Sequence, residues 1–263
     1  MTDFKDRRVL ITGASSGIGA AIAVEFARKG AELYLAARTV SKLEDVQKKC
    51  AGLGSKTEIF SVDMASTESV DAFADEIERR GVLLDVIVLN AGISQRALTF
   101  DTDFEVDRKI METNFFGPVY LTKKLAPQIR GERKVSLAVT TSISGLFGFP
   151  LRSAYCASKH ALFGFFESLE LENPNVRVTF LIPGRINTPI SRSALSGDGS
   201  AHASMDAGQA NGMDVDKCAK VAVKAIARGC HRKLIGRGEL VMVYIKKWCP
   251  WLFFKIAGRI SAT

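Results

Sequence analysis

Short runs rich in valine, isoleucine and leucine alternate along this chain with longer segments of helical period. The runs lie at 7–12, 32–37, 57–62, 84–90, 134–141, 176–182 and 232–236. The helical segments lie at 17–29, 40–51, 66–80, 103–130, 152–172 and 214–228, with Ser66 and Asp214 as N-caps of two of them. Because such alternation is typical of strands buried on both faces, it predicts an α/β fold. We expect a doubly wound, seven-stranded parallel sheet of the Rossmann type with helices on both faces, and ligands beyond the carboxyl ends of the strands.

The chain is expected to form a single domain, because 263 residues of which 47% are hydrophobic can bury one substantial core. Residues 1–238 should form this domain, and the basic, aromatic stretch 239–263 should pack on it as a C-terminal extension. In the segment 191–212, 14 of 22 residues are serine, glycine or alanine. This composition predicts a mobile lid over the substrate.

A glycine-rich turn joins the first predicted strand to the first predicted helix, in Thr12-Gly13-Ala14-Ser15-Ser16-Gly17-Ile18-Gly19. Gly13 permits a tight turn, Gly17 lets the backbone approach a pyrophosphate, and Gly19 lets the helix pack closely on the sheet. The amino terminus of the helix attracts negative charge. An ordinary flexible turn is the alternative, but the strand before it and the helix after it favour a dinucleotide-binding site.

Three polar side chains point to proton chemistry: Ser142 ends the fifth predicted strand, and Tyr155 and Lys159 follow on a predicted helix. Tyr155 and Lys159 are four residues apart, so they share one helix face. A nearby ammonium group favours the phenolate and is expected to lower the pKa of Tyr155, which suits this side chain to act as general acid/base. Ser142 and Tyr155 are expected to contact the substrate oxygen. The alternative is an ordinary surface pair.

Together these motifs resemble those of the short-chain dehydrogenase/reductase family, whose glycine turn has three residues between its first two glycines, as here. The resemblance covers residues 5–190. It implies four catalytic residues, Asn114, Ser142, Tyr155 and Lys159, with Asn114 supporting the lysine through a water molecule. The motifs and the resemblance place the coenzyme contacts at Gly13, Ser15, Ser16, Gly17, Ile18, Gly19, Arg38, Asp63, Met64, Asn90, Ala91, Gly92, Tyr155, Lys159, Pro183, Gly184, Ile186 and Thr188.

The choice of coenzyme is read from the end of the second predicted strand, Ala37-Arg38, where dinucleotide folds meet the adenosine ribose. An acidic residue there would favour NAD. Ala37 is neutral instead, and the guanidinium of Arg38 can donate charge-assisted hydrogen bonds to a 2′-phosphate. Ser15 or Ser16 could add a hydroxyl donor. We therefore predict NADP(H) as the coenzyme, the alternative being that Arg38 points into solvent.

The apolar run Leu146-Phe147-Gly148-Phe149-Pro150-Leu151 predicts a pocket for a lipophilic substrate. Residues 212–225 and 244–250 resemble the dehydrogenase/reductase 7 group, many of whose members are membrane-associated reductases of lipophilic carbonyls. We expect an oxidoreductase that transfers hydride between NADP(H) and the carbonyl or hydroxyl carbon of a steroid, retinoid or other ketone or aldehyde. The alternative is a catalytically inactive nucleotide-binding sensor or scaffold. No metal is expected, because the three histidines and five cysteines lack ligand spacing.

The net charge of +8 is concentrated at the C-terminal end, where residues 215–263 carry 11 lysines and arginines against 2 acidic residues. The mixture of aromatic and cationic residues at 240–256 predicts peripheral contact with an anionic membrane. The alternative is packing on the substrate entrance or on a neighbouring subunit. The longest uncharged run there, 248–254, is too short to span a bilayer. No nucleic-acid partner is expected, because no recognised binding motif accompanies the charge.

Location and assembly rest on two further observations. The chain begins Met1-Thr2-Asp3-Phe4-Lys5 without the pattern of a signal peptide, so we expect a cytoplasmic protein, peripheral on the cytosolic membrane face. The predicted helices 103–130 and 152–172 carry several phenylalanines, and the equivalent helices of the family pack against their copies. The resemblance therefore implies a homodimer or homotetramer.

Overall fold

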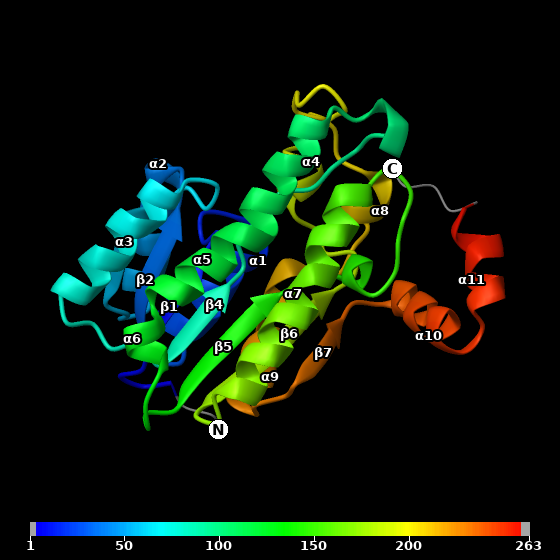
Figure 1. Ribbon diagram of the computed structural model, residues 1–263. Helices are drawn as coiled ribbons and strands as arrows, with labels where there is room; N and C mark the ends of the chain where they lie inside the picture. The colour runs from blue at the N-terminus through cyan, green and yellow to red at the C-terminus, as the bar shows by residue number, and fades with distance from the viewer. Residues whose placement is uncertain (1–3, 259–263) are drawn as a thin grey trace.

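Seven parallel strands form the centre of the structure, a computed structural model that describes residues 4–258 (Figure 1). The strands are β1 (Arg8–Thr12), β2 (Glu32–Ala37), β3 (Thr57–Ser61), β4 (Val86–Leu89), β5 (Val135–Thr140), β6 (Val176–Pro183) and β7 (Arg232–Ile235). Their order in the sheet is β3-β2-β1-β4-β5-β6-β7, and each neighbouring pair is parallel. The predicted doubly wound sheet is confirmed. Its order reverses between β1 and β4, the place where such folds bind their ligands.

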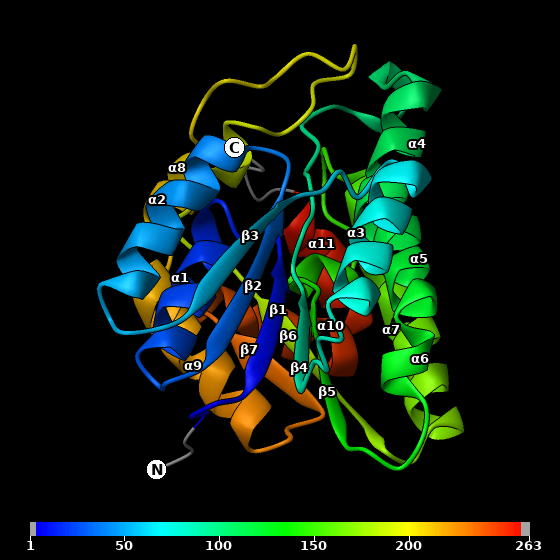
Figure 2. The ribbon, with the colours of Figure 1, turned by 90° about the vertical axis from the view of Figure 1, so that its left-hand side faces the viewer.

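Helices cover both faces of the sheet (Figure 2). On one face lie α1 (Gly17–Ala27), α2 (Val40–Ala51) and α9 (Val215–Ala227), and on the other α3 (Thr67–Arg79), α5 (Gly117–Lys124) and α7 (Ser153–Glu172). The middle of strand β1 is apolar because its side chains are buried on both faces of the sheet. Val9 and Ile11 belong to the core beneath α1, Leu10 belongs to the core on the opposite face, and all three are fully buried. Burial on both faces removes the polar alternation of a half-exposed strand.

Side-chain caps fix the starts of two helices. The Ser66 Oγ accepts a hydrogen bond from the backbone N–H of Ser69 at 3.1 Å, at the start of α3. The Asp214 Oδ1 accepts from the backbone N–H of Lys217 at 3.0 Å, at the start of α9. Each oxygen satisfies an amide that the helix leaves unpaired. Both residues are therefore N-caps, as predicted.

The predicted helix over 103–130 is divided into several parts. It begins with α4 (Phe104–Met111), widens into a π-helical turn at Glu112–Phe116, continues as α5 and ends with the short α6 (Ala126–Ile129). The prediction of a helix over this range holds for nearly all of its residues, but sequence period does not register the wider turn or the break at Leu125. The wider turn carries Asn114, whose side chain hydrogen-bonds the backbone of Ile93 in the loop after β4.

Two short helices, α10 (Val241–Trp248) and α11 (Pro250–Ala257), follow β7 and lie beyond this edge strand (Figure 1). Pro250 is the first residue of α11 and separates the two helices. Phe253 is 1% exposed, and its ring centroid lies 5.0 Å from that of Phe147. Glu239 accepts hydrogen bonds from the backbone N–H groups of Arg185 and Arg237. These contacts join residues 239–258 to the sheet domain, whereas residues 259–263 of the predicted extension lie outside the described residues.

Short elements complete the chain. They are the 3-10 turns η1 (Thr99–Asp101), η3 (Ile143–Gly145), η4 (Pro189–Ser191) and η5 (Gly238–Leu240) and the helical turn α8 (Ala207–Ala210). No helix within residues 4–258 has both the length and the apolar character needed to cross a membrane.

The packing of α11 can be tested by comparing adjacent phenylalanines. Phe253→Ala should lower the free energy of unfolding by about 3–5 kcal/mol, because it leaves a cavity against Phe147. Phe254→Ala is the matched control, since that side chain is 68% exposed. Urea denaturation of both variants measures the difference. Equal losses for the two variants would show that the buried contact does not anchor the extension.

Candidate active site

Two cavities open at the carboxyl edge of the sheet. The first, called the apolar cavity, has a volume of about 750 Å³, and its walls include Ile143, Phe147, Phe149 and Met242. The second, called the glycine-turn cleft, has a volume of about 630 Å³ and follows the ends of β1, β2 and β4. Both cavities are lined by Tyr155, Pro183 and Thr188. This shared wall is where molecules held in the two cavities would meet.

The residues expected to hold a coenzyme divide between these cavities. Gly184 and Ile186 line the apolar cavity. Gly19 lines neither cavity. The glycine-turn cleft is lined by Gly13, Ser15, Ser16, Gly17, Ile18, Arg38, Asp63, Met64, Asn90, Ala91, Gly92, Tyr155, Lys159, Pro183 and Thr188.

The glycine turn has the backbone that its sequence predicts. Gly13 and Gly17 have φ values of +65° and +55°, in the left-handed region that favours glycine. A Cβ on Gly19 would lie 2.3 Å from the carbonyl oxygen of Gly13, so only glycine allows α1 to begin this close to the turn. The Ser16 side chain makes no capping hydrogen bond with the described residues. The first amides of α1 therefore face the cleft without a side-chain cap, and they suit a pyrophosphate.

Thr12 joins the glycine turn to the Asn-Ala-Gly turn after β4. Its Oγ1 accepts hydrogen bonds from the backbone N–H groups of Asn90 and Ala91 at 3.0 and 3.2 Å. The Asn90 side chain donates back to the carbonyl oxygens of Thr12 and Gly13. These bonds fix the two turns against each other across the switch point of the sheet. The sequence places Thr12 at the start of the glycine turn but gives it no role, because its hydroxyl meets Asn90 and Ala91 only in the folded chain.

The far end of the cleft carries positive charge. Ala37 ends β2, and Arg38 follows it on the cleft wall. Lys42, in the first turns of α2, also lines the cleft and was not predicted. Its position four residues after Arg38 was the only available signal. Asp63 lines the same cleft, and its Oδ1 accepts a hydrogen bond from the backbone N–H of Ala65 at 3.0 Å.

The catalytic candidates converge where the two cavities meet. Ser142 lines the apolar cavity, Lys159 lines the glycine-turn cleft, and Tyr155 lines both. Lys159 is 3% exposed, and its Nζ donates to the carbonyl oxygen of Thr140 at 2.9 Å. The Nζ lies 5.9 Å from the centre of the Tyr155 ring. The two side chains therefore do not form the surface pair that the sequence left open.

Burial controls the acidity of these groups. It lowers the pKa of Lys159 to about 8, because an ammonium group loses its hydration inside the protein. Burial also raises the pKa of Tyr155, while a hydrogen bond with Ser142 and the positive charges of Arg152 and Arg96 lower it. From the sequence we expected the ammonium group of Lys159 to lower the pKa of Tyr155. In the structure burial is the largest influence on Tyr155, and Ser142 gives the largest opposing one.

Asn114 supports the loop beside the lysine. Its Nδ2 donates to the carbonyl oxygen of Ile93 at 2.9 Å and to the Ser158 Oγ at 3.1 Å, and its Oδ1 accepts from the Ile93 N–H at 2.8 Å. Gly92 lies between this amide and Lys159, since a Cβ there would be 3.1 Å from the Asn114 Oδ1 and 3.4 Å from the Lys159 Nζ. The asparagine therefore lies next to the lysine, as the family resemblance implies.

The apolar cavity is less uniform than the sequence suggests. Phe147 and Phe149 line it, as expected from the apolar run. Charged side chains line it too, among them Arg96, Arg152 and Asp206, and these three were not predicted. They come from distant parts of the chain, so no local pattern could have joined them.

Among residues 4–258, no group of three or more histidine, cysteine, aspartate or glutamate side chains is placed to hold a metal ion.

Several known proteins are similar to this chain. Residues 7–198 match the family model described as short chain dehydrogenase. Dehydrogenase/reductase SDR family member 7B of Mus musculus is 39% identical over 257 residues, which cover 94% of this chain and 79% of the relative. Dehydrogenase/reductase SDR family protein 7-like of Drosophila melanogaster is 36% identical over 258 residues, covering 95% and 79%.

Two solved structures have a similar fold. A short chain dehydrogenase/reductase from Burkholderia phymatum in complex with NAD gives a TM-score of 0.82 at 23% identity, over 96% of each chain. An alcohol dehydrogenase from the archaeon Thermococcus sibiricus, complexed with 5-hydroxy-NADP, gives a TM-score of 0.74 at 26% identity, over 89% of this chain and 97% of that one. The chain therefore belongs to the short-chain dehydrogenase/reductase family of oxidoreductases.

Proposed function

We propose that this protein is an NADP(H)-dependent oxidoreductase that transfers hydride between the coenzyme and the carbonyl or hydroxyl carbon of a lipophilic steroid, retinoid, ketone or aldehyde. The observation that carries the proposal is the position of Tyr155 on the wall shared by the two cavities. A coenzyme in the glycine-turn cleft and a substrate in the apolar cavity would both reach this phenol.

The residues of the cleft fit a dinucleotide. The uncapped start of α1 and the left-handed glycines would hold the pyrophosphate, and Asp63 and Met64 would contact the adenine side. Thr188 and the backbone at Pro183, Gly184 and Ile186 would hold the carboxamide end. When bound there, the coenzyme supplies or accepts the hydride.

Tyr155 and Ser142 perform the proton chemistry in this proposal. During carbonyl reduction the Tyr155 Oη donates its proton to the substrate oxygen, and during alcohol oxidation it takes the proton back. The Ser142 Oγ donates a hydrogen bond to the same oxygen and stabilises its developing negative charge. Below a pH of about 8 the Lys159 ammonium is present, which favours the phenolate left on Tyr155. Asn114 holds the loop beside that ammonium.

A catalytically inactive sensor or scaffold of the same fold is the second candidate. It would bind the coenzyme without turning over a substrate. The presence of Ser142, Tyr155 and Lys159 around one junction favours the enzyme, because a scaffold does not require these side chains together. Measured turnover separates the two candidates.

NADP(H) is proposed over NAD because of the charge at the end of β2. The relevant groups are the neutral Ala37 and the cations Arg38 and Lys42 on the cleft wall. A 2′-phosphate would accept charge-assisted hydrogen bonds from such cations. The similar solved structures hold NAD in one case and 5-hydroxy-NADP in the other, so the choice rests on these residues.

The extension is proposed to place the enzyme at an anionic membrane on the cytosolic face, with the protein otherwise cytoplasmic. Lys246 and Lys247 lie against aromatic rings of α10 and α11. Four aromatic side chains of this helix pair are exposed, Tyr244, Trp248, Trp251 and Phe254. Aromatic and cationic groups in this combination suit a lipid interface.

A homodimer or homotetramer is proposed from the family resemblance.

Removal of one hydroxyl tests the chemistry. Tyr155→Phe should lower kcat for phenanthrenequinone, retinal and a steroid ketone by at least about a hundredfold, because the general acid is lost, while NADPH still binds. Tyr120→Phe is the control, since that hydroxyl bonds Asp71 away from the cavities. Nicotinamide absorbance measures turnover and coenzyme fluorescence measures binding. A Tyr155→Phe variant that keeps more than about a tenth of wild-type kcat would remove Tyr155 from the acid/base role.

Coenzyme choice is tested at Arg38. The wild type should prefer NADPH to NADH by at least about tenfold in kcat/KM, and Arg38→Ala should lose most of this preference, because the phosphate loses its charge-assisted partner. Arg28→Ala, beyond the end of α1 and outside the cleft, is the control and should keep the preference. Unchanged preference in Arg38→Ala, or equal use of both coenzymes by the wild type, contradicts this assignment.

Membrane contact is tested by flotation with phosphatidylserine vesicles. The wild type should float at low salt and detach as salt is raised, because screening weakens its attraction to the lipid charge. A variant with Trp248→Ala, Trp251→Ala and Phe254→Ala should float much less. Phe100→Ala with Phe104→Ala removes two exposed rings elsewhere and serves as control. Equal flotation of all three proteins would mean that the extension is no anchor.

A further inference from the structure

The segment 191–212 is fastened to the body of the domain. It begins in η4 and ends just after α8. Ser191 and Ala194 are fully buried. The backbone N–H of Leu195 donates to the carbonyl oxygen of Ser94 at 2.9 Å, and the carbonyl oxygen of Leu195 accepts from the N–H of Arg96 at 2.8 Å. The loop after β4 therefore holds this segment by paired backbone hydrogen bonds.

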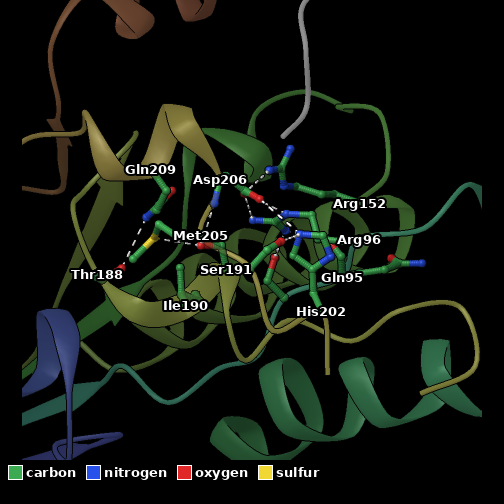
Figure 3. Close-up of polar contacts among 12 residues, drawn as sticks. Gln95, Arg96, Arg152, Thr188, Ile190, Ser191, His202, Met205, Asp206 and Gln209 are labelled. Carbon is green, nitrogen blue, oxygen red and sulfur yellow. Dashed lines mark hydrogen bonds and ion pairs between the residues drawn. The ribbon is translucent and has the colours of Figure 1, made fainter. Parts of the chain in front are cut away.

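A buried ion pair makes the second attachment (Figure 3). The Asp206 Oδ2 accepts hydrogen bonds from the Arg96 Nε at 2.9 Å and from its Nη2 at 2.5 Å. The two side chains are 3% and 4% exposed. Arg152, at the start of α7, also approaches the same oxygen at 3.3 Å. The carboxylate thus reaches from the segment 191–212 into the body of the domain.

The guanidinium of Arg96 is also held by hydrogen bonds within its own loop. Its Nη1 donates to the Ser94 Oγ at 2.8 Å and to the carbonyl oxygen of Gln95 at 2.6 Å. The loop that carries it is held by Asn114 through the backbone of Ile93. A planar group with its donors committed in this way offers one orientation to a carboxylate. Asp206 is therefore positioned by the loop.

The same loop also contacts the helix that carries Tyr155. The Gln95 Oε1 accepts from the backbone N–H of Ala154 at 3.1 Å, one residue before the tyrosine. Arg96 and Asp206 both line the apolar cavity beside Tyr155. One short loop thus connects the start of α7, a wall of the cavity and the segment 191–212.

We propose that Arg96 and Asp206 are positioning residues whose buried ion pair holds the segment 191–212 closed as a wall of the apolar cavity. The part of the proposal that concerns turnover rests on the proposed function. By shaping the wall that a substrate touches, the pair sets the KM for the substrate and leaves proton transfer at Tyr155 and coenzyme binding largely unchanged.

The energetics of a buried pair explain why it can act as a latch. The pair is favourable only while both charges are together. Without Asp206 the buried charge of Arg96 loses its carboxylate, and without Arg96 the carboxylate of Asp206 keeps only the longer contacts with Arg152 and His202. Loss of one partner is therefore relieved by movement of the segment that carries Asp206 toward water. Ala194 and Leu195 are buried at the start of the segment, but within residues 196–212 Asp206 is the one buried residue, so few apolar contacts there oppose the opening.

Hydrogen exchange tests the latch without any turnover. In the full chain with NADPH, amides of 191–212 should exchange at least about tenfold faster in Asp206→Asn and in Arg96→Met than in the wild type. The double variant should exchange no faster than the faster single variant, because both changes break one contact. Asp198→Asn is the matched control, since this exposed aspartate of the same segment bonds only to Ser200 among the described residues.

Peptides from β5 and β6 provide the internal standard. Faster exchange confined to 191–212 supports the proposal. Unchanged exchange of 191–212 in Asp206→Asn overturns it. Equal acceleration of 191–212 and the sheet peptides also overturns it, because the pair would then stabilise the whole domain.

Kinetics test the consequence for the site. With phenanthrenequinone, Asp206→Asn should raise KM by about tenfold, change kcat by less than about threefold, and leave the Kd for NADPH unchanged. A loss confined to kcat would overturn the positioning role. If the wild type fails to turn over phenanthrenequinone and the other carbonyls, the proposed function fails, while hydrogen exchange still decides the latch.

Discussion

Parallel alignment of all seven strands is the constraint on which the rest of this structure depends. Because the carboxyl ends of all seven strands lie at the same edge of the sheet, the residues that follow the strands meet there although they are far apart in the sequence. For this reason Gly13 after β1 and Asn90 after β4 line the glycine-turn cleft, Ser142 after β5 lines the apolar cavity, and Thr188 after β6 lines both. The reversal of strand order between β1 and β4 opens the space that they share.

Hydrogen bonds from buried side chains turn this edge into a defined site. Thr12 and Asn90 hold two turns together across the switch point, and Asn114 holds the following loop. Lys159 is placed beside Tyr155 by α7, and the Thr140 carbonyl accepts from its ammonium. Each of these bonds satisfies a group that would otherwise be buried without a partner, so the polar site and the apolar core are compatible.

Sequence reasoning succeeded where the information is local. The glycine turn, the spacing of Tyr155 and Lys159 and the strand pattern depend on neighbours within a few residues, and the fold and the walls of the glycine-turn cleft followed from them. It failed for Arg96 and Asp206, which are 110 residues apart and meet only in the folded chain. It also failed for the π-helical turn at Asn114 and for the acidity of Tyr155, because the first needs backbone geometry and the second needs the degree of burial.

The central claim is that a coenzyme in the glycine-turn cleft brings its nicotinamide to Tyr155 at the junction with the apolar cavity. A crystal structure of the full chain with NADP⁺ measures this directly. We expect the pyrophosphate at the start of α1, the 2′-phosphate against Arg38, and the nicotinamide ring between Tyr155 and Thr188. A well-ordered NADP⁺ whose nicotinamide lies away from Tyr155, or which binds outside the glycine-turn cleft, would contradict the account.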